Sequence, residues 1–280
     1  MANGAHTVSF WTNFKKYLPL LSNLAGKDFK IKYRRSVLGV IWSVLNPLLT
    51  MLVLTAVFGS LFGMNRGADI GDFAVYYIVG AAIWNFFSEA TSLSLTSVIT
   101  AAPLIKKVYV PKYIFPLEKC LFALINFAFS LVAVALVMAI RFGNISGTFG
   151  ATVLLFPIPV FYCLLFVMGM SLILSAVSVY FQDVIHLYSV VLTLWMYLTP
   201  LIYPMSMIEN AGGSFLKTVA LPIIKYNPMT QYIQYFRDVV IYGKIPGLLP
   251  NLICFAYGLL VLIIGVLVFN KLQKRFILHI

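Results

Sequence analysis

Polar side chains interrupt an otherwise apolar stretch of the sequence around Glu89. The run WNFFSEATSLSLTS (84–97) places this carboxyl group close to the amide of Asn85 and among several Ser and Thr hydroxyls. Such groups are unfavourable in a bilayer unless they are paired, so we expect them to face a bundle interior or a partner subunit. Two interpretations of Glu89 stay open: a structural hydrogen bond between helices, and a role in a transport pathway or its gating.

Aromatic side chains gather in two later segments, LWMYLTPLIYP (194–204) and PMTQYIQYFRDVVIY (228–242). In the second segment Tyr232, Tyr235, Val239 and Tyr242 recur at spacings of three, four and three, which places them on one mainly aromatic stripe of a helix. One explanation is an aromatic belt at the level of the lipid headgroups. The alternative is a surface for sugar, since aromatic faces can pack against the C–H faces of a pyranose. The candidates are Trp195, Tyr197, Tyr203, Tyr232 and Tyr235.

A dense basic cluster lies in KDFKIKYRR (27–35), directly before a long apolar run that reaches residue 62. Lys and Arg next to a membrane span are retained on the cytoplasmic side, so the junction predicts an integral membrane protein whose first span starts inside. The preceding residues carry an apolar stripe and are too short and polar to span. This pattern favours one or two amphipathic helices over about 12–35, lying in the inner interface, with Pro19 early in or breaking the first. A solvated basic tail is the alternative.

Motifs of enzyme chemistry are absent from the sequence. The three His residues are isolated, and neither HExxH, GxSxG nor an Asp-rich metal motif occurs. The phosphate loop GxxxxGK[ST] is also missing, so any ATP-driven process requires another polypeptide. We therefore expect no catalytic residue, no metal and no cofactor in this chain.

Composition supports a membrane protein. Of 280 residues, 61% are hydrophobic and 10% are charged, whereas a soluble domain has about 25% charged residues. The net charge of +12 is a poor argument for nucleic acid. The basic residues lie beside apolar runs, where they orient spans and meet anionic lipid headgroups.

Six apolar stretches reach the roughly 20 residues that a bilayer requires. They cover about 37–62, 73–99, 114–140, 151–180, 184–205 and 248–270. The segments predicted to lie inside hold many Lys and Arg, whereas the short outer loops hold only Arg66 and Arg141. This bias predicts cytoplasmic N- and C-termini and an even number of spans.

The segment between the fifth and sixth stretches is apolar but repeatedly broken by Gly and Pro. Asn227 and Pro228 predict a helix N-cap and first turn, and Gly243 predicts the C-terminal stop. We expect short helices over 206–245 that dip into the outer leaflet and are buried against protein, because irregular backbone cannot face lipid. The sequence thus predicts an all-α integral membrane protein. Its parts are an interfacial segment 1–36, a six-span domain 37–270 and a cytoplasmic tail 271–280.

Several blocks of sequence, in order and in register, resemble a known family. They are YRRSVLGVIWSVLNPLL (33–49), GAAIWNFFSEA (80–90), LIKKVYVPKYIFPLEK (104–119), YFQDVIHLYSVVLTLWMYLTPLIYP (180–204) and YNPMTQYIQYFRDVV (226–240). Over about residues 25–270 the chain resembles the permease subunits of ABC-2-type exporters of polysaccharide, O-antigen and teichoic acid. These subunits move undecaprenyl-linked glycans across the bacterial cytoplasmic membrane.

The resemblance implies a homodimer whose subunits each dock on a separate nucleotide-binding ATPase, where ATP-Mg would bind. It further implies roles for three groups of residues. The ATPase-coupling group is a helix at 104–110 and a second contact at 179–186, with Leu104, Ile105, Lys106, Lys107, Val108, Tyr109, Asp183 and His186. The substrate entrance is Lys30, Lys32, Tyr33, Arg34 and Arg35. The glycan pathway and gate comprise Asn85, Glu89 and the five aromatic candidates above.

Two other functions stay open at this point. An ABC-2 permease for a smaller lipid or drug would share the same blocks. A membrane-embedded enzyme of lipid-linked sugars would require a catalytic His or an acidic cluster at the interface, and the sequence shows neither.

Overall fold

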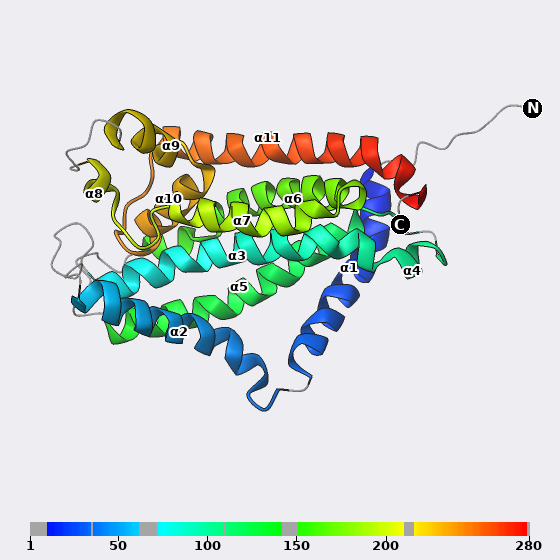
Figure 1. Cartoon of the computed structure of the whole chain (residues 1–280). Coiled ribbons are helices and arrows are strands. Elements are labelled where there is room, and N and C mark those ends of the chain that lie inside the picture. Colours follow the sequence, from blue (N-terminus) through cyan, green and yellow to red (C-terminus); the bar gives the residue numbers. More distant parts are fainter. Residues whose placement is uncertain are drawn as a thin grey trace, which may run out of the picture.

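The computed structural model describes residues 10–34, 36–61, 72–108, 110–141, 151–209 and 216–278. Every regular element in these ranges is a helix. Arg35, Arg66 and Tyr109 lie outside the described residues, so the predictions made for them stay predictions. The long helices run side by side along one axis (Figure 1).

The predicted apolar stretches coincide with helices. They are α2 (Trp42–Leu54, flanked by η1 Gly39–Ile41 and the π-helix η2 Thr55–Leu61), α3 (Phe73–Thr100), α5 (Ile114–Ile140), α6 (Pro157–Tyr180, preceded by η5 Ala151–Leu155), α7 (Asp183–Tyr197) and α11 (Leu248–Leu272). Helix α7 ends at Tyr197 rather than near residue 205. Pro200 lacks a backbone N–H, and the residue before a proline disfavours helical geometry, which explains the early end.

Four helical stretches in the described residues are long and apolar enough to cross a bilayer: Gly39–Ser60, Ile114–Ile140, Thr152–Tyr180 and Leu248–Phe276. Helix α3 has 28 residues, about 42 Å at 1.5 Å per residue, but its polar side chains lower its hydropathy. Helix α7 is apolar but has only 15 residues. The structure thus supports a multi-pass helical membrane protein, with two of the six predicted spans below these criteria.

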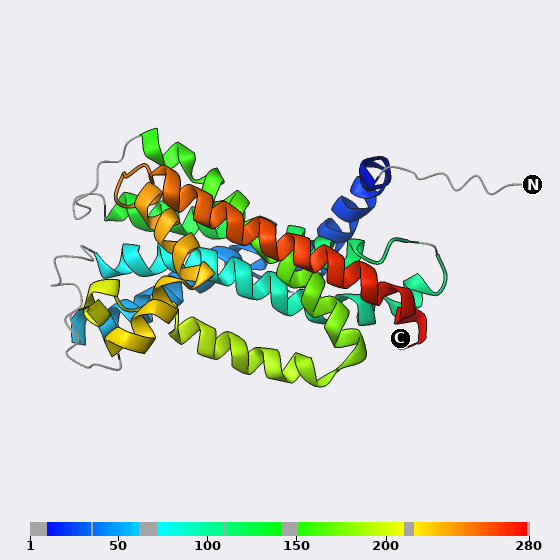
Figure 2. The same ribbon diagram turned by 90° about the horizontal axis from the view of Figure 1, so that it is seen from above.

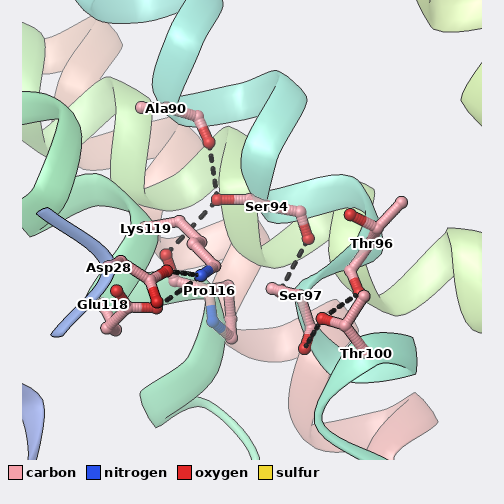
Figure 3. Close-up of polar contacts among 9 residues, drawn as sticks. All are labelled: Asp28, Ala90, Ser94, Thr96, Ser97, Thr100, Pro116, Glu118 and Lys119. Atoms are coloured by element: carbon pink, nitrogen blue, oxygen red, sulfur yellow. Dashed lines mark hydrogen bonds and ion pairs between the residues drawn. The ribbon is translucent and has the colours of Figure 1, made fainter. Parts of the chain in front are cut away.

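Helix α1 (Phe10–Tyr33) is a single helix that continues through Pro19. Its Asp28 carboxylate pairs with Lys119 at the start of α5, and Lys119 also contacts the neighbouring Glu118 carboxylate at 3.1 Å. Figure 3 shows these three side chains meeting between the two helices. The chain then turns back through Gly39, which has φ 51°, so α1 and α2 form a V beside the bundle (Figure 1).

Helices α6 and α11 make the closest contact of the bundle, through glycines. A Cβ atom on Gly265 would lie 2.4 Å from the Gly169 carbonyl oxygen, so the two backbones touch directly. Such close approach is a common way for membrane helices to associate. Cys120, Cys163 and Cys254 are buried and free, as expected of small hydrophobic side chains.

One end of the bundle, which we call the basic end, carries α4 (Ala102–Ile105), Lys106, Lys107 and the C-terminal 3-10 turn η7 (Gln273–Leu278). Phe276 of this turn is fully buried and packs edge-on against Phe269. The Lys112 ammonium donates to the Gln273 carbonyl at 2.8 Å, and burial lowers the pKa of Lys112. The C-terminal turn η7 is therefore fixed beside the start of α5.

The opposite end carries α8 (Met205–Glu209), the π-helix η6 (Leu216–Ala220), α9 (Leu221–Lys225) and α10 (Pro228–Val240). The predicted cap of α10 is confirmed, because the Asn227 side chain accepts from the Met229 N–H at 3.0 Å. Gly243 has φ 60°, the left-handed geometry expected just after a helix. Figure 2 shows α7 lying apart from α11, with the short helices gathered at the far end from the C-terminus.

Candidate functional site

A cleft of about 840 Å³, lined by both polar and apolar side chains, lies among α1, α2, α3, α5 and α7. The predicted pathway residues Asn85 and Glu89 line it from α3, and the predicted entrance residues Lys32 and Tyr33 line it from the end of α1. The structure thus brings together residues separated by more than fifty positions in sequence. A cleft that is rich in amides and hydroxyls inside an apolar helix bundle is a candidate binding site.

Glu89 is the centre of the polar contacts in this cleft. Its Oε1 atom accepts from the Lys32 ammonium at 2.8 Å and from the Asn126 amide at 2.8 Å. The Lys32 ammonium also lies 5.2 Å from the centre of the Phe122 ring. Tyr33 and Ser43 hydrogen bond at 3.0 Å. These contacts hold the end of α1 against α3 and α5.

The ion pair of Lys32 and Glu89 is accessible rather than sealed, because the side chains are 41% and 29% exposed. Exposed pairs of this kind contribute about 0–1 kcal/mol in water. The pair can therefore open without unfolding the protein. The main effect of the pair is on the charge of the cleft. Among the described residues that line it, Lys32 and Glu89 are the charged side chains, and each neutralises the other.

Six Ser and Thr hydroxyls of the cleft donate to backbone carbonyls three or four residues earlier in the chain. The pairs are Ser43 to Val40 (2.7 Å), Thr50 to Asn46 (2.9 Å), Ser88 to Asn85 (3.3 Å), Ser130 to Phe127 (2.8 Å), Ser189 to His186 (2.7 Å) and Thr193 to Ser189 (3.0 Å). Figure 3 shows the same pattern further along α3, where Ser94 donates to Ala90 and Thr100 to Thr96. Such back-bonding is how Ser and Thr satisfy their protons inside a helix.

Three of the five aromatic candidates lie in the protein core rather than in the cleft. The Tyr232 hydroxyl donates to the Cys254 carbonyl at 3.0 Å, and the Tyr235 hydroxyl hydrogen bonds the Asn251 side chain at 2.6 Å. The Trp195 indole N–H donates to the Asn227 side chain at 2.8 Å, and its ring packs edge-on against Phe87. In this conformation these rings fix α10 and α7 to the bundle.

The other two aromatic candidates lie near the end of α7. Tyr197 is 63% exposed, and its carbonyl accepts from the Tyr203 hydroxyl at 2.7 Å. The Tyr203 phenol is the donor of this bond, which links the bend after α7 to the end of that helix. Of the five rings, Tyr197 is therefore the one presented at the surface.

The coupling candidates lie at the basic end, on two separate surfaces. The helix predicted at 104–110 occurs earlier, as the single turn α4, because Pro103 suits the start of a helix and Pro111 cannot continue one. Leu104 and Ile105 belong to α4, and the residues that follow form a turn. Lys106, Lys107 and Val108 are exposed, as are Asp183 and His186 at the start of α7.

Other functional candidates were missed at the sequence level. Asn126 and Ser130 on α5 line the cleft, and their polarity within an apolar run was the available signal. Asn46 and Thr50 on α2 face it too. The described residues contain no group of three or more His, Cys, Asp and Glu side chains that could hold a metal.

Comparison with known proteins decides the family. The family model described as ABC-2 type transporter matches residues 20–241. The chain belongs to the ABC-2 type transporter family. It is 28% identical over 260 residues to the O-antigen export system permease protein RfbA of Klebsiella pneumoniae, covering 92% of this chain and 93% of that protein.

A second relative agrees. The chain is 29% identical over 261 residues to the O-antigen export system permease protein RfbA of Myxococcus xanthus, covering 93% of this chain and 95% of that protein. The ABC-2 match extends from α1 through α10, so it includes every helix that lines the cleft. The resemblance noted in the sequence is thereby confirmed for the family.

Proposed function

We propose that the chain is the permease subunit of an ABC exporter that moves an undecaprenyl-linked polysaccharide across the bacterial cytoplasmic membrane. The observation that carries the proposal is the cleft with its polar side chains, because a hydrophilic cargo needs a polar route between apolar helices. All the residues that line it fall within the ABC-2 match. The relatives' names, O-antigen export system permease, support the same cargo class. The chain itself acts by binding and moving its cargo, not by catalysis.

The proposed topology has six spans, with α3 and α7 added to the four apolar stretches. Asn85, Glu89 and the Ser and Thr hydroxyls give α3 a polar face that a bundle interior can accept, which explains its low hydropathy. Lys106, Lys107, Lys271 and Lys274 gather at the basic end, so this end and both termini are cytoplasmic by the positive-inside rule. Helices α8 to α10 then lie at the outer face as gate helices.

The proposed partners are a second copy of the chain and two copies of a separate ATPase, which hold ATP-Mg. The exposed turn after α4 and the exposed start of α7 are both at the basic end, where an ATPase would dock. Membrane lipids complete the surroundings, and the chain binds no cofactor of its own.

The proposed route begins at the end of α1. Lys30, Lys32 and Arg34 are exposed there and, with Tyr33 and Arg35, would attract the diphosphate of the lipid-linked glycan. The glycan then passes Asn85 and Glu89 in the cleft toward α10. When ATP binding in the partner rocks the helices, Trp195, Tyr197, Tyr203, Tyr232 and Tyr235 offer rings to the sugars at the outer gate.

The function is tested by reconstitution. The chain is purified with each candidate ATPase and placed in liposomes, and ATP hydrolysis is measured with and without an undecaprenyl-diphosphate-linked glycan. We expect a stable complex whose hydrolysis rises with the glycan. ATPase alone in the same liposomes is the control. A chain that forms no complex with any ATPase would refute the proposal.

The gate aromatics have their own test. Replacing Tyr232 and Tyr235 with Phe removes the hydroxyls that bond Cys254 and Asn251 but keeps the rings. Without these two hydrogen bonds α10 is held less firmly against α11, so we expect export to fall. Assembly of the complex with the ATPase should be unchanged. Unchanged export would show that neither hydroxyl is needed for transport.

A further inference from the structure

The cleft carries no net charge that a polyanion could use. Lys32 is its cation, and Glu89 already accepts from the Lys32 ammonium at 2.8 Å. The rest of the lining in the described residues is uncharged and consists of amides, hydroxyls, aromatic rings and aliphatic side chains. An anionic polymer would have to break this ion pair and would then meet the Glu89 carboxylate, which repels it.

The hydroxyl groups of the cleft are also poor partners for an anionic polymer. A Ser or Thr hydroxyl has one proton to donate and two lone pairs that accept. The protons of Thr50, Ser88, Ser189 and Thr193 are given to carbonyls of α2, α3 and α7. What these side chains present to the cleft is therefore mainly oxygen lone pairs, which are hydrogen-bond acceptors.

A lining of acceptors matches a cargo that donates. The hydroxyls of a sugar chain each bring a proton, so they can pair with these oxygens and with the Glu89 carboxylate. Phosphodiester oxygens only accept, so neither these back-bonded hydroxyls nor the Glu89 carboxylate can replace the hydration that a phosphodiester loses. The ring of Trp42, 44% exposed and part of the lining, offers an apolar face for the C–H side of a sugar.

We propose that the cleft selects uncharged, hydroxyl-rich glycans over polymers with charged phosphodiester repeats. The inference rests on the proposed export function and narrows its cargo class. The diphosphate of the lipid anchor is common to both kinds of cargo and is met by the basic residues at the end of α1, so the selection concerns the repeats alone.

The test compares two lipids that share one anchor. One is undecaprenyl diphosphate carrying an oligomer of uncharged hexoses, and the other carries glycerol phosphate units of the same number. In liposomes containing the chain and its ATPase, the concentration of each lipid that half-maximally stimulates ATP hydrolysis is measured. We expect the hexose lipid to act at a concentration about tenfold lower, the effect of a difference of about 1.4 kcal/mol in binding.

A charge variant sharpens the test. Glu89→Gln keeps an oxygen for the Asn126 amide but leaves Lys32 without its counter-charge, so the glycerol phosphate lipid should improve about tenfold relative to the hexose lipid. Adding Lys32→Met to Glu89→Gln makes the cleft neutral again, and the preference for hexose should return. Glu209→Gln, an equal charge change on exposed α8, is the matched control and should leave the preference unaltered.

The outcomes separate the two claims. If both lipids stimulate hydrolysis at equal concentrations, or the glycerol phosphate lipid is preferred, export stands and the selectivity is wrong. If neither lipid stimulates a complex that has basal ATPase activity, the proposed function is wrong and the selectivity falls with it. If the preference for the hexose lipid is the same in the parent and in the Glu89→Gln variants, the role given to the ion pair is also contradicted.

Discussion

Arg237 joins three segments at the end of the bundle opposite the basic end. Its guanidinium is fully buried and donates to the carbonyls of Tyr76 at 3.2 Å, Pro200 at 2.8 Å and Leu201 at 3.3 Å. Its central carbon lies 3.5 Å from the centre of the Tyr76 ring, a close cation–π contact. Through these contacts α10 is fixed to α3 and to the bend that follows α7.

Arg237→Lys is expected to destabilise the protein strongly. A lysine has one ammonium in place of the planar fork, so it cannot reach all three carbonyls. Hydrogen bonds to charged groups contribute about 1.5–3 kcal/mol each, so the loss should exceed about 2 kcal/mol. Thermal unfolding of the purified protein in detergent measures it. Arg275→Lys, at an exposed site in the C-terminal turn, is the control, and equal unfolding temperatures would contradict the argument.

Residue roles differ in how far the sequence predicts them. The Asn227 cap was predictable, because its partner is two positions away. The role of Arg237 was not, since its partners lie 36 to 161 positions away and nothing local marks them. The role of Glu89 was predictable only in part. Its polarity was evident in an apolar run, while its partners Lys32 and Asn126 are set by the tertiary fold.

At the scale of elements, the pairing of α6 with α11 depends on backbone contact. Gly265→Ala would place a Cβ 2.4 Å from the Gly169 carbonyl oxygen, so one helix must shift. We expect a lower unfolding temperature and looser packing of α11. Gly26→Ala is the matched control, because nothing lies within 4 Å of its Cβ and Ala favours a helix over Gly. A Gly265→Ala protein as stable as the parent would exclude the close contact.

The turn after α4 has a separate prediction that rests on the proposed function. Reversing the charge of exposed Lys106 and Lys107 to Glu should uncouple ATP hydrolysis from transport, so that less glycan is exported per ATP hydrolysed while the fold persists. Lys271→Glu, an exposed change on α11, controls for charge at the same end. Coupling is measured as glycan exported per ATP hydrolysed. An unchanged ratio in the double variant would remove this turn from the coupling surface.

Helix positions were largely predictable because hydropathy and capping act locally. Helices α5 and α11 occupy their predicted ranges closely. Predictions failed where proline chemistry outweighed hydropathy: α7 stops at Tyr197, before Pro200, and α4 is a single turn, Ala102–Ile105, with Pro103 in its first turn. Helix α1 continues through Pro19 and packs against α5, a tertiary contact that no local pattern shows.

At the scale of the whole molecule, the class and family followed from the sequence, and the cleft did not. Composition and the blocks of resemblance led to a helical ABC-2 membrane protein, which the family match confirms. The cleft is assembled from five helices spread from α1 to α7, so its shape exists only in the fold. Its polarity is the feature on which the account of export depends.

Movement of glycan across a bilayer tests the central claim most directly. Liposomes containing the chain and its ATPase are loaded with a fluorescent undecaprenyl-diphosphate-linked hexose oligomer on the outer leaflet, and ATP is added outside. Complexes whose ATPases face outward should carry the oligomer inside, where a glycosidase in the medium cannot cleave it. The account predicts protection that grows with ATP and is absent without hydrolysis. Full cleavage despite active ATP hydrolysis would contradict it.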